Sequence, residues 1–124
     1  MPTSDENKAI IRSWFEDHLN WGLDHALAAT PDYLARPEQA EPVMRYIYTA
    51  FAGIRYTVED MVAEGDKLVV RWTCRQTHRG EYLGVPATGR EVTASGISIY
   101  RMEQGKIAEE WAVVDRLGLL EQMR

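Results

Sequence analysis

The sequence lacks several features that would assign it to a special class of protein. Its one cysteine, Cys74, excludes an internal disulfide and a cysteine-rich zinc site. The three histidines, His18, His25 and His78, are not spaced as a metal-binding pair, so we expect no bound metal. No apolar run approaches the roughly 20 residues that cross a bilayer, and we expect no membrane partner. The polar, acidic residues 1–8 do not have the pattern of a signal peptide, which favours a cytoplasmic protein.

Positive charge is also scarce. Fourteen lysines and arginines face 19 aspartates and glutamates, so the formal net charge is −5. Nucleic-acid binding requires a concentrated basic face, and the arginines of this chain are dispersed, so we expect no nucleic-acid partner. An anionic membrane surface is disfavoured for the same reason. With 124 residues, of which 45% are hydrophobic, the chain can bury one core, and we expect a single domain over residues 1–124.

Aromatic residues, in contrast, are abundant, with four tryptophans and six tyrosines. They either pack in the core or line a pocket for an organic ligand, because such pockets combine apolar walls with a few polar groups. The candidates for a pocket wall are Trp14, Tyr33, Tyr46, Trp72 and Tyr100. The hydroxyl of Tyr46 or of Tyr48 is a candidate hydrogen-bond partner for a ligand carbonyl.

The first half of the chain has the periodicity of helices. Apolar residues at helical spacing predict a helix over residues 4–19, with Ser4 or Asp5 as its cap. Proline and glycine then divide the remainder of this half. We expect a helix over 23–29 that stops at Thr30-Pro31, a loop over 31–42, and a helix over 42–52 that ends at Gly53.

From Ile54 onward the period changes to two, which is typical of strands. We predict strands over 54–63, 67–78, 90–102 and 106–115, followed by a short helix over 116–123. Gly96 lies inside the third strand and favours a strong curl there. Helices followed by consecutive antiparallel strands predict an α+β fold, in which a curved sheet and the helices enclose a cone-shaped pocket.

Four blocks of the second half are TVEDMVAEGDKLVVRW, THRGEYLGVPATGREV, GISIYRMEQGKIAEEW and DRLGLLEQM. In order and spacing they resemble the SnoaL-like polyketide cyclase (ester cyclase) family, within the nuclear transport factor 2-like superfamily. The resemblance implies a cystatin-like α+β barrel with a cone-shaped pocket for a hydrophobic small-molecule ligand. It also implies a homodimer, and catalysis without a metal or an organic cofactor.

The same resemblance implies where the acid/base residues of a cyclase would lie. The aspartate that family cyclases carry on the last strand falls at Ala112, and the histidine of the preceding strand falls at Ser98. Neither functional residue is present, so the standard cyclase mechanism is not expected here. Ser98 and Ala112 remain candidate ligand-binding residues, together with Trp14, Tyr46 and Trp72.

The alternation of side chains along the last predicted strand indicates another carboxylate that could replace the missing aspartate. If position 112 faces the pocket, Glu110 faces it too, whereas Trp111 and Val113 face the other way and suit a dimer interface. An apolar cavity raises the pKa of a carboxyl group towards the range useful for proton transfer. Glu110 is therefore the first candidate base. The alternative is that it belongs to an exposed Glu109-Glu110 pair.

Two further residues are candidates for catalytic roles beside Glu110. His78, near a strand end, can donate a hydrogen bond to the substrate, or it can pin the following loop. Asp115 can support the site, or it can cap the C-terminal helix. Cys74 has no evident base beside it, and we expect it to be a buried structural residue.

These observations favour an enzyme that acts on a hydrophobic, carbonyl-containing small molecule by cofactor-independent acid/base catalysis. Aldol cyclisation, isomerisation and dehydration all fit this description. Two alternatives remain at this stage. One is a non-catalytic small-molecule-binding protein on the same fold, and the other is a structural module whose pocket is filled by aromatic side chains.

Overall fold

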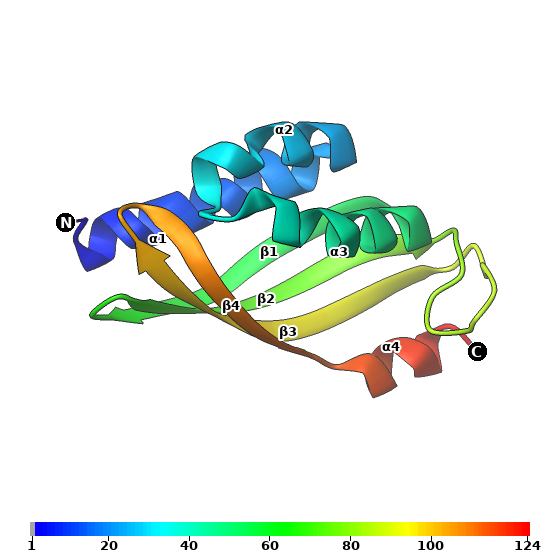
Figure 1. Cartoon of the computed structure of the whole chain (residues 1–124). Helices are drawn as coiled ribbons and strands as arrows, with labels where there is room; N and C mark the ends of the chain where they lie inside the picture. Colours follow the sequence, from blue (N-terminus) through cyan, green and yellow to red (C-terminus); the bar gives the residue numbers. More distant parts are fainter. Residues whose placement is uncertain (1) are drawn as a thin grey trace.

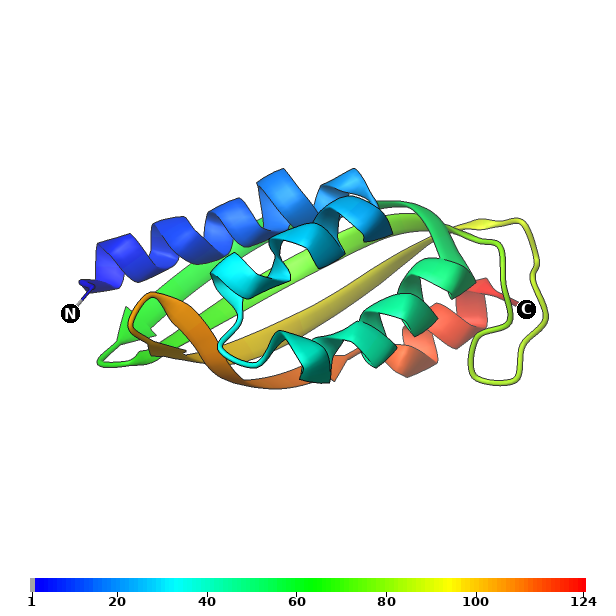
Figure 2. The ribbon, with the colours of Figure 1, turned by 45° about the horizontal axis from the view of Figure 1, so that its top comes forward.

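The structure is a computed structural model that describes residues 2–124, with helices laid over one curved antiparallel sheet (Figure 1). The strands pair in chain order, β1-β2-β3-β4. The predicted α+β fold is confirmed, and α1, α2 and α3 lie on one side of the sheet (Figure 2). The elements are α1 (Ser4–Ser13), the π-helix η1 (Trp14–His18), the 3₁₀ turn η2 (Leu19–Trp21), α2 (Leu23–Tyr33), α3 (Pro37–Ala50), β1 (Phe51–Glu64), β2 (Lys67–His78), β3 (Glu91–Glu103), β4 (Lys106–Val114) and α4 (Arg116–Gln122).

Alternating sequence patterns determine which face of each strand is buried. In β2, whose bounds match the predicted strand over 67–78, every even-numbered residue from Leu68 to His78 is buried. Even-numbered residues of β3 also point inward, so the two strands share one concave face against the helices. The outer face carries exposed ion pairs, which contribute little to stability. These pairs are Arg71–Asp60, Arg75–Glu91 and Arg101–Glu109, each 2.6 Å apart.

Gly96 allows a tryptophan to lie across β3. A Cβ atom at this position would lie 2.5 Å from Cζ2 of Trp72 and 2.8 Å from the carbonyl oxygen of Val113. Both separations are shorter than real Cβ contacts, so only glycine fits. The indole of Trp72 can therefore cross over Gly96 and donate a hydrogen bond to Ser98 Oγ at 3.0 Å.

Thr3, and not Ser4 or Asp5, caps the first helix. The Thr3 hydroxyl accepts a hydrogen bond from the backbone amide of Glu6 at 3.1 Å, and the Glu6 carboxylate accepts one from the backbone amide of Thr3 at 3.1 Å. This reciprocal arrangement is a capping box, and it satisfies two amides that the helix leaves without partners. The expected helix over 4–19 is regular only as far as Ser13, because the chain then widens into the π-helix η1.

The second helix passes through its proline, so the predicted stop at Thr30-Pro31 was wrong. α2 continues to Tyr33 with Pro31 inside it. A proline lacks an amide hydrogen, which leaves the carbonyl of residue 27 without its helical donor. The Thr30 hydroxyl donates to the Leu27 carbonyl oxygen at 2.9 Å and replaces that missing bond.

The third helix begins earlier than predicted, and the expected loop over 31–42 was wrong. α3 starts at Pro37, which occupies the first helical turn where a missing amide hydrogen costs nothing, and Pro42 lies inside the helix. The helix ends at Ala50, so Gly53 does not terminate it. Gly53 instead lies in β1 at φ +64°, where the pairing with β2 shifts register. No helix in residues 2–124 is long and apolar enough to cross a membrane.

Aromatic rings fill much of the space between the helices and the sheet. Phe15 meets the edge of Tyr56 at a centroid distance of 5.2 Å and that of Tyr100 at 6.5 Å. Phe15 and Tyr100 are almost completely buried. Edge-to-face pairs of this kind add to the stabilisation that the buried area provides. The same three rings also form part of the wall of a cavity between the helices and the concave face of the sheet.

Candidate functional site

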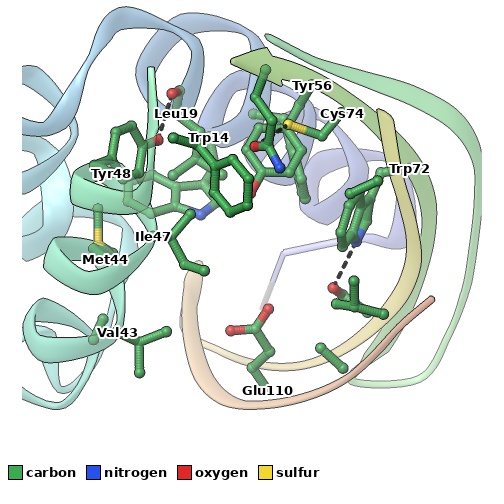
Figure 3. Close-up of a pocket in the computed structure, with 18 of the residues that line it drawn as sticks. Trp14, Leu19, Val43, Met44, Ile47, Tyr48, Tyr56, Trp72, Cys74 and Glu110 are labelled. Atoms are coloured by element: carbon green, nitrogen blue, oxygen red, sulfur yellow. Dashed lines mark hydrogen bonds between the residues drawn. The ribbon is translucent and has the colours of Figure 1, made fainter. Parts of the chain in front are cut away.

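A cavity of about 380 Å³ lies between the helices and the concave face of the sheet (Figure 3). Aromatic and aliphatic side chains make up most of its wall. The helices contribute Trp14, Phe15, Leu19, Val43, Met44, Ile47 and Tyr48, and the sheet contributes Phe51, Tyr56, Trp72, Cys74, Ala94, Tyr100, Ile107, Ala112 and Val114. The lining residues with a carboxylate, guanidinium or amide side chain are Gln39, Gln76, Glu110 and Arg116.

Glu110 projects from β4 into this cavity, with its carboxylate facing the open space (Figure 3). Ala112 lies on the same face of the strand and also lines the cavity. Trp111 and Val113 lie on the opposite face, where they are 47% and 75% exposed. The neighbouring Glu109 is also directed outward, where its carboxylate accepts a hydrogen bond from Arg101 at 2.6 Å. Glu109 and Glu110 are thus both exposed, but they lie on opposite faces of β4.

Glu110 remains an exposed residue of β4, but the surroundings of its carboxyl group shift its pKa upward. Removal of water by the cavity walls raises the pKa of Glu110, because a charge is costly away from bulk solvent. The hydroxyls of Tyr100 and Ser98 stabilise the charged form and act in the opposite direction, but they do not cancel the effect of burial. Glu110 remains accessible from the cavity, so a ligand can reach a carboxyl group whose proton affinity is increased.

Tyr100 is the cross-strand partner of Glu110. Burial raises the pKa of Tyr100 well above its usual value, and the negative charge of Glu110 acts in the same direction. The phenol is therefore protonated throughout the physiological range and can donate a hydrogen bond. Glu110 and Tyr100 thus place a proton acceptor and a proton donor side by side on an apolar wall.

Ser98 extends this polar group to Trp72. The indole nitrogen of Trp72 has only a hydrogen to offer, so the 3.0 Å bond makes Ser98 Oγ the acceptor. The hydroxyl hydrogen of Ser98 is then free to point towards Glu110 or a ligand. Ser98 is opposite Ala112 in the ladder between β3 and β4, and both line the cavity. Of the predicted ligand-binding residues, Trp14, Trp72, Ser98 and Ala112 therefore lie at the cavity.

His78 is not among the residues that line the cavity. Its side chain is completely buried, and Nδ1 lies 3.0 Å from the Thr88 hydroxyl and accepts from the Thr88 amide at 3.3 Å. The backbone of His78 also contacts the connection that precedes β3, through bonds with Gly89 and Arg90. The structure therefore places His78 where it pins that connection, which is the structural alternative that the sequence left open.

Asp115 and Tyr46 also lie away from the cavity wall. The Asp115 carboxylate accepts a hydrogen bond from the Gly118 amide at 3.0 Å and caps α4. The Tyr46 hydroxyl accepts from the Leu83 amide at 2.9 Å, and its ring stacks on Tyr82. Both side chains are thus engaged with local backbone. Among the described residues, no group of three or more histidine, cysteine or acidic side chains is placed to hold a metal ion.

Several lining residues were not singled out from the sequence. Gln76 shares the even-numbered face of β2 with Trp72, and this alternation could have identified it. Tyr56 was harder to find, because β1 changes register twice and its alternation is broken. Arg116 follows the last strand, where no period applies. Cys74 also lines the cavity, but burial raises the pKa of its thiol to about 12, which opposes a nucleophilic role.

Comparison with known proteins identifies one family and a set of similar structures. The family described as "SnoaL-like polyketide cyclase" matches residues 22–123, a range that includes all four blocks noted in the sequence. No curated protein matches the chain.

Three solved structures illustrate the similarity of the fold. A protein from Jannaschia sp. CCS1 is 20% identical, with a TM-score of 0.87 and coverage of 99% of this chain and 94% of that one. TsrD from Streptomyces laurentii is 24% identical, with a TM-score of 0.84 and coverage of 99% and 98%. A SnoaL-like polyketide cyclase from Agrobacterium tumefaciens is 18% identical, with a TM-score of 0.81 and full coverage of both chains, 100% each. At these identities the similarity extends to the fold and not to the chemistry.

Proposed function

Since the chain belongs to the SnoaL-like polyketide cyclase family, we propose that it is an enzyme that moves a proton next to a carbonyl group of a hydrophobic small molecule. Aldol cyclisation, isomerisation and dehydration can all begin with this step. The observation that carries the proposal is the Glu110 carboxyl group, which faces an apolar cavity and has a raised pKa. A raised pKa makes a carboxyl group a stronger base once it is ionised, which suits it to accept a proton from carbon.

The acid/base pair is displaced along the sheet in this proposal. The family resemblance assigns the usual aspartate and histidine to the positions of Ala112 and Ser98, which face each other across the ladder. Tyr100 and Glu110 form the next inward-facing pair of the same ladder. The displacement is two residues along each strand, or about 7 Å. A carboxylate and a proton donor are thus retained on the same wall of the same cavity.

The reaction uses these side chains in order. Ionised Glu110 takes a proton from the carbon next to the substrate carbonyl, and the electron pair of the broken bond forms an enolate. The protonated Tyr100 hydroxyl, or that of Ser98, donates a hydrogen bond to the enolate oxygen and stabilises its charge. Glu110 then returns the proton. It goes to a carbon in an isomerisation, and to the oxygen of the new or departing hydroxyl group in an aldol cyclisation or a dehydration.

Proton exchange in heavy water tests this proposal without knowledge of the natural substrate. A panel of hydrophobic ketones and diketones is incubated with the protein, and NMR follows deuterium entry beside the carbonyl. We expect exchange faster than in buffer, by about 10²–10⁴-fold for a compound that fits. A ligand that raises the melting temperature without exchange would instead support the binding-protein alternative. Neither exchange nor a rise in melting temperature would favour the structural module.

We also propose that two copies of the chain associate through the outer face of β3 and β4. Ile97 pairs with Val113 across this face, and Trp111 lies beside them; the three are 47%, 75% and 47% exposed. A contiguous apolar patch left in water is costly, and a two-fold axis lets the patch cover itself.

A charge placed in this patch should separate the copies. We expect Val113→Glu to be monomeric at a concentration at which the wild type is a dimer, as measured by light scattering after gel filtration. Val62→Glu is the matched control, because Val62 is 62% exposed but lies next to the β1–β2 turn. A monomeric wild type at micromolar concentration would contradict this interface.

A further inference from the structure

A chain of hydrogen bonds between side chains connects the first helical segment to α2. Ser13 Oγ donates to Asp17 Oδ2 at 2.9 Å and lies 2.6 Å from the Tyr33 hydroxyl. That hydroxyl is 3.0 Å from His18 Nε2, and His18 Nδ1 is 3.1 Å from His25 Nε2. The two imidazoles are within 23° of parallel, with centroids 5.1 Å apart. Five side chains from α1, η1 and α2 are thus linked in a row.

The direction of every bond in this row follows from its acidic end. An ionised carboxylate only accepts, so the single hydroxyl hydrogen of Ser13 goes to Asp17. Ser13 Oγ must then accept a hydrogen bond from the Tyr33 hydroxyl. Because that hydroxyl has only one hydrogen, its oxygen must accept from His18 Nε2–H. A neutral imidazole carries one N–H, so His18 Nδ1 is an acceptor, and His25 Nε2–H donates to it. Both histidines are therefore Nε2–H tautomers, and Nδ1 of His25 carries the lone pair at the end of the row.

This row supports one wall of the cavity. The Trp14 indole lies 5.2 Å from the Tyr33 ring and 6.3 Å from the His18 ring, measured between centroids. Trp14 is 5% exposed and lines the cavity (Figure 3). Trp14 and His18 are the first and last residues of the π-helix, a distortion that often occurs at functional sites. Trp14 thus packs against Tyr33 and His18. The hydrogen bonds of the row orient these same two side chains.

We propose that the Asp17–Ser13–Tyr33–His18–His25 row is a positioning device that holds Trp14 in the cavity wall and so helps to set ligand affinity. The Asp17 carboxylate gives the row its direction, and Tyr33 and His18 transmit that direction to the rings against Trp14. None of the five residues is among those that line the cavity, so their effect on a ligand passes through Trp14. The role in ligand selection rests on the proposed function, whereas the tautomer assignment stands independently of it.

Histidine side-chain nitrogen shifts measured by NMR at about pH 8, where free histidine is neutral, test the tautomers directly. In the wild type we expect His18 and His25 to be Nε2–H tautomers. In Asp17→Asn the amide can donate to Ser13, which permits the whole row to reverse, so His18 should shift towards Nδ1–H. Asp24→Asn removes an exposed carboxylate of α2 outside the row and should change neither tautomer. An Nδ1–H tautomer at His18 in the wild type would overturn the assignment.

The effect on the cavity is measured with the fluorescent apolar probe anilinonaphthalene sulfonate, which requires no turnover. Tyr33→Phe keeps the ring against Trp14 but removes the hydroxyl that links Ser13 to His18. We expect Tyr33→Phe and Asp17→Asn to weaken probe binding by about fivefold, the order expected for one net hydrogen bond. Asp24→Asn should bind as the wild type does. Unchanged affinity in both row variants would refute the positioning role, even if proton exchange by Glu110 were found.

Discussion

Replacement of Glu110 by glutamine is expected to slow proton exchange beside a substrate carbonyl by about 10²–10⁴-fold, with little change in substrate affinity. Glutamine has nearly the same shape and can still contact Tyr100 and Ser98, but it cannot take up a proton. The measurement compares kcat and KM for the compound that exchanges fastest with the wild type. Glu109→Gln is the matched control, because Glu109 binds Arg101 on the outer face and does not line the cavity.

The pH profile provides a second readout of the same residue. A general base is active when ionised, so the wild-type rate should fall as the pH drops through the raised pKa of Glu110. Because desolvation raises that pKa, the fall should occur at a higher pH than for an ordinary glutamate. Glu109→Gln should retain this profile. A Glu110→Gln variant with the wild-type rate would show that another group is the base.

Thermal unfolding distinguishes lost chemistry from lost structure. A carboxyl group whose pKa is raised on folding stabilises the fold while it is protonated, and this contribution is lost as the pH rises through the folded-state pKa. Glutamine mimics the protonated form at every pH. Glu110→Gln should therefore be at least as stable as the wild type at neutral pH, and the two should converge towards acid. A less stable Glu110→Gln variant at neutral pH would contradict the raised pKa of Glu110.

Replacement of Gly96 by alanine is expected to destabilise the protein by about 1–3 kcal/mol, the usual cost of overpacking a well-filled site. The added methyl group would meet the edge of the Trp72 indole and the backbone oxygen of Val113. Relief of the first contact requires the indole to move away from Ser98, which breaks the bond that orients the Ser98 hydroxyl. Urea denaturation measures the loss of stability, and the chemical shift of the Trp72 indole N–H reports the movement.

A double-mutant cycle separates the two contacts. Trp72→Phe removes the outer ring of the indole and leaves the backbone of Val113 in place. If the indole is the main obstacle, Gly96→Ala should cost less in the Trp72→Phe background than in the wild type, with a coupling of about 0.5–3 kcal/mol. An equal cost in both backgrounds would show that the Val113 carbonyl, and not Trp72, requires glycine at this position.

Local patterns predicted the second half of the chain well. The strand over 67–78 needed only its alternation and the turn before it, and β2 has the same bounds. The same period of two predicted that Glu110 and Ala112 share a face opposite Trp111 and Val113, because side chains alternate along any regular strand. The turns at Gly65 and Gly105 are clear in the sequence, so the start of the following strand could be located and its inward-facing positions assigned correctly.

The first half was predicted less well because its breaks are compensated by contacts that the pattern does not reveal. Pro31 remains inside α2 because the Thr30 hydroxyl takes over the bond that the proline lacks. Pro37, rather than Pro42, occupies the first turn of α3, although either proline fits that position by sequence. Gly53 accommodates an irregularity of the sheet and not the end of a helix.

By itself the sequence determined the α+β class, the strands, the family resemblance and the face on which Glu110 lies, since each depends on periodicity or on local blocks of residues. Only the tertiary structure decided which side chains meet. Register across β3 and β4 brought Tyr100 opposite Glu110, and the crossing at Gly96 brought Trp72 to Ser98. The packing of α2 on η1 linked Asp17 to His25 through the hydrogen bonds of Ser13, Tyr33 and His18. His78 and Tyr46 contact the connection before β3 instead of the cavity. Such contacts join segments that are distant in the sequence, so the period along one strand or helix does not predict them.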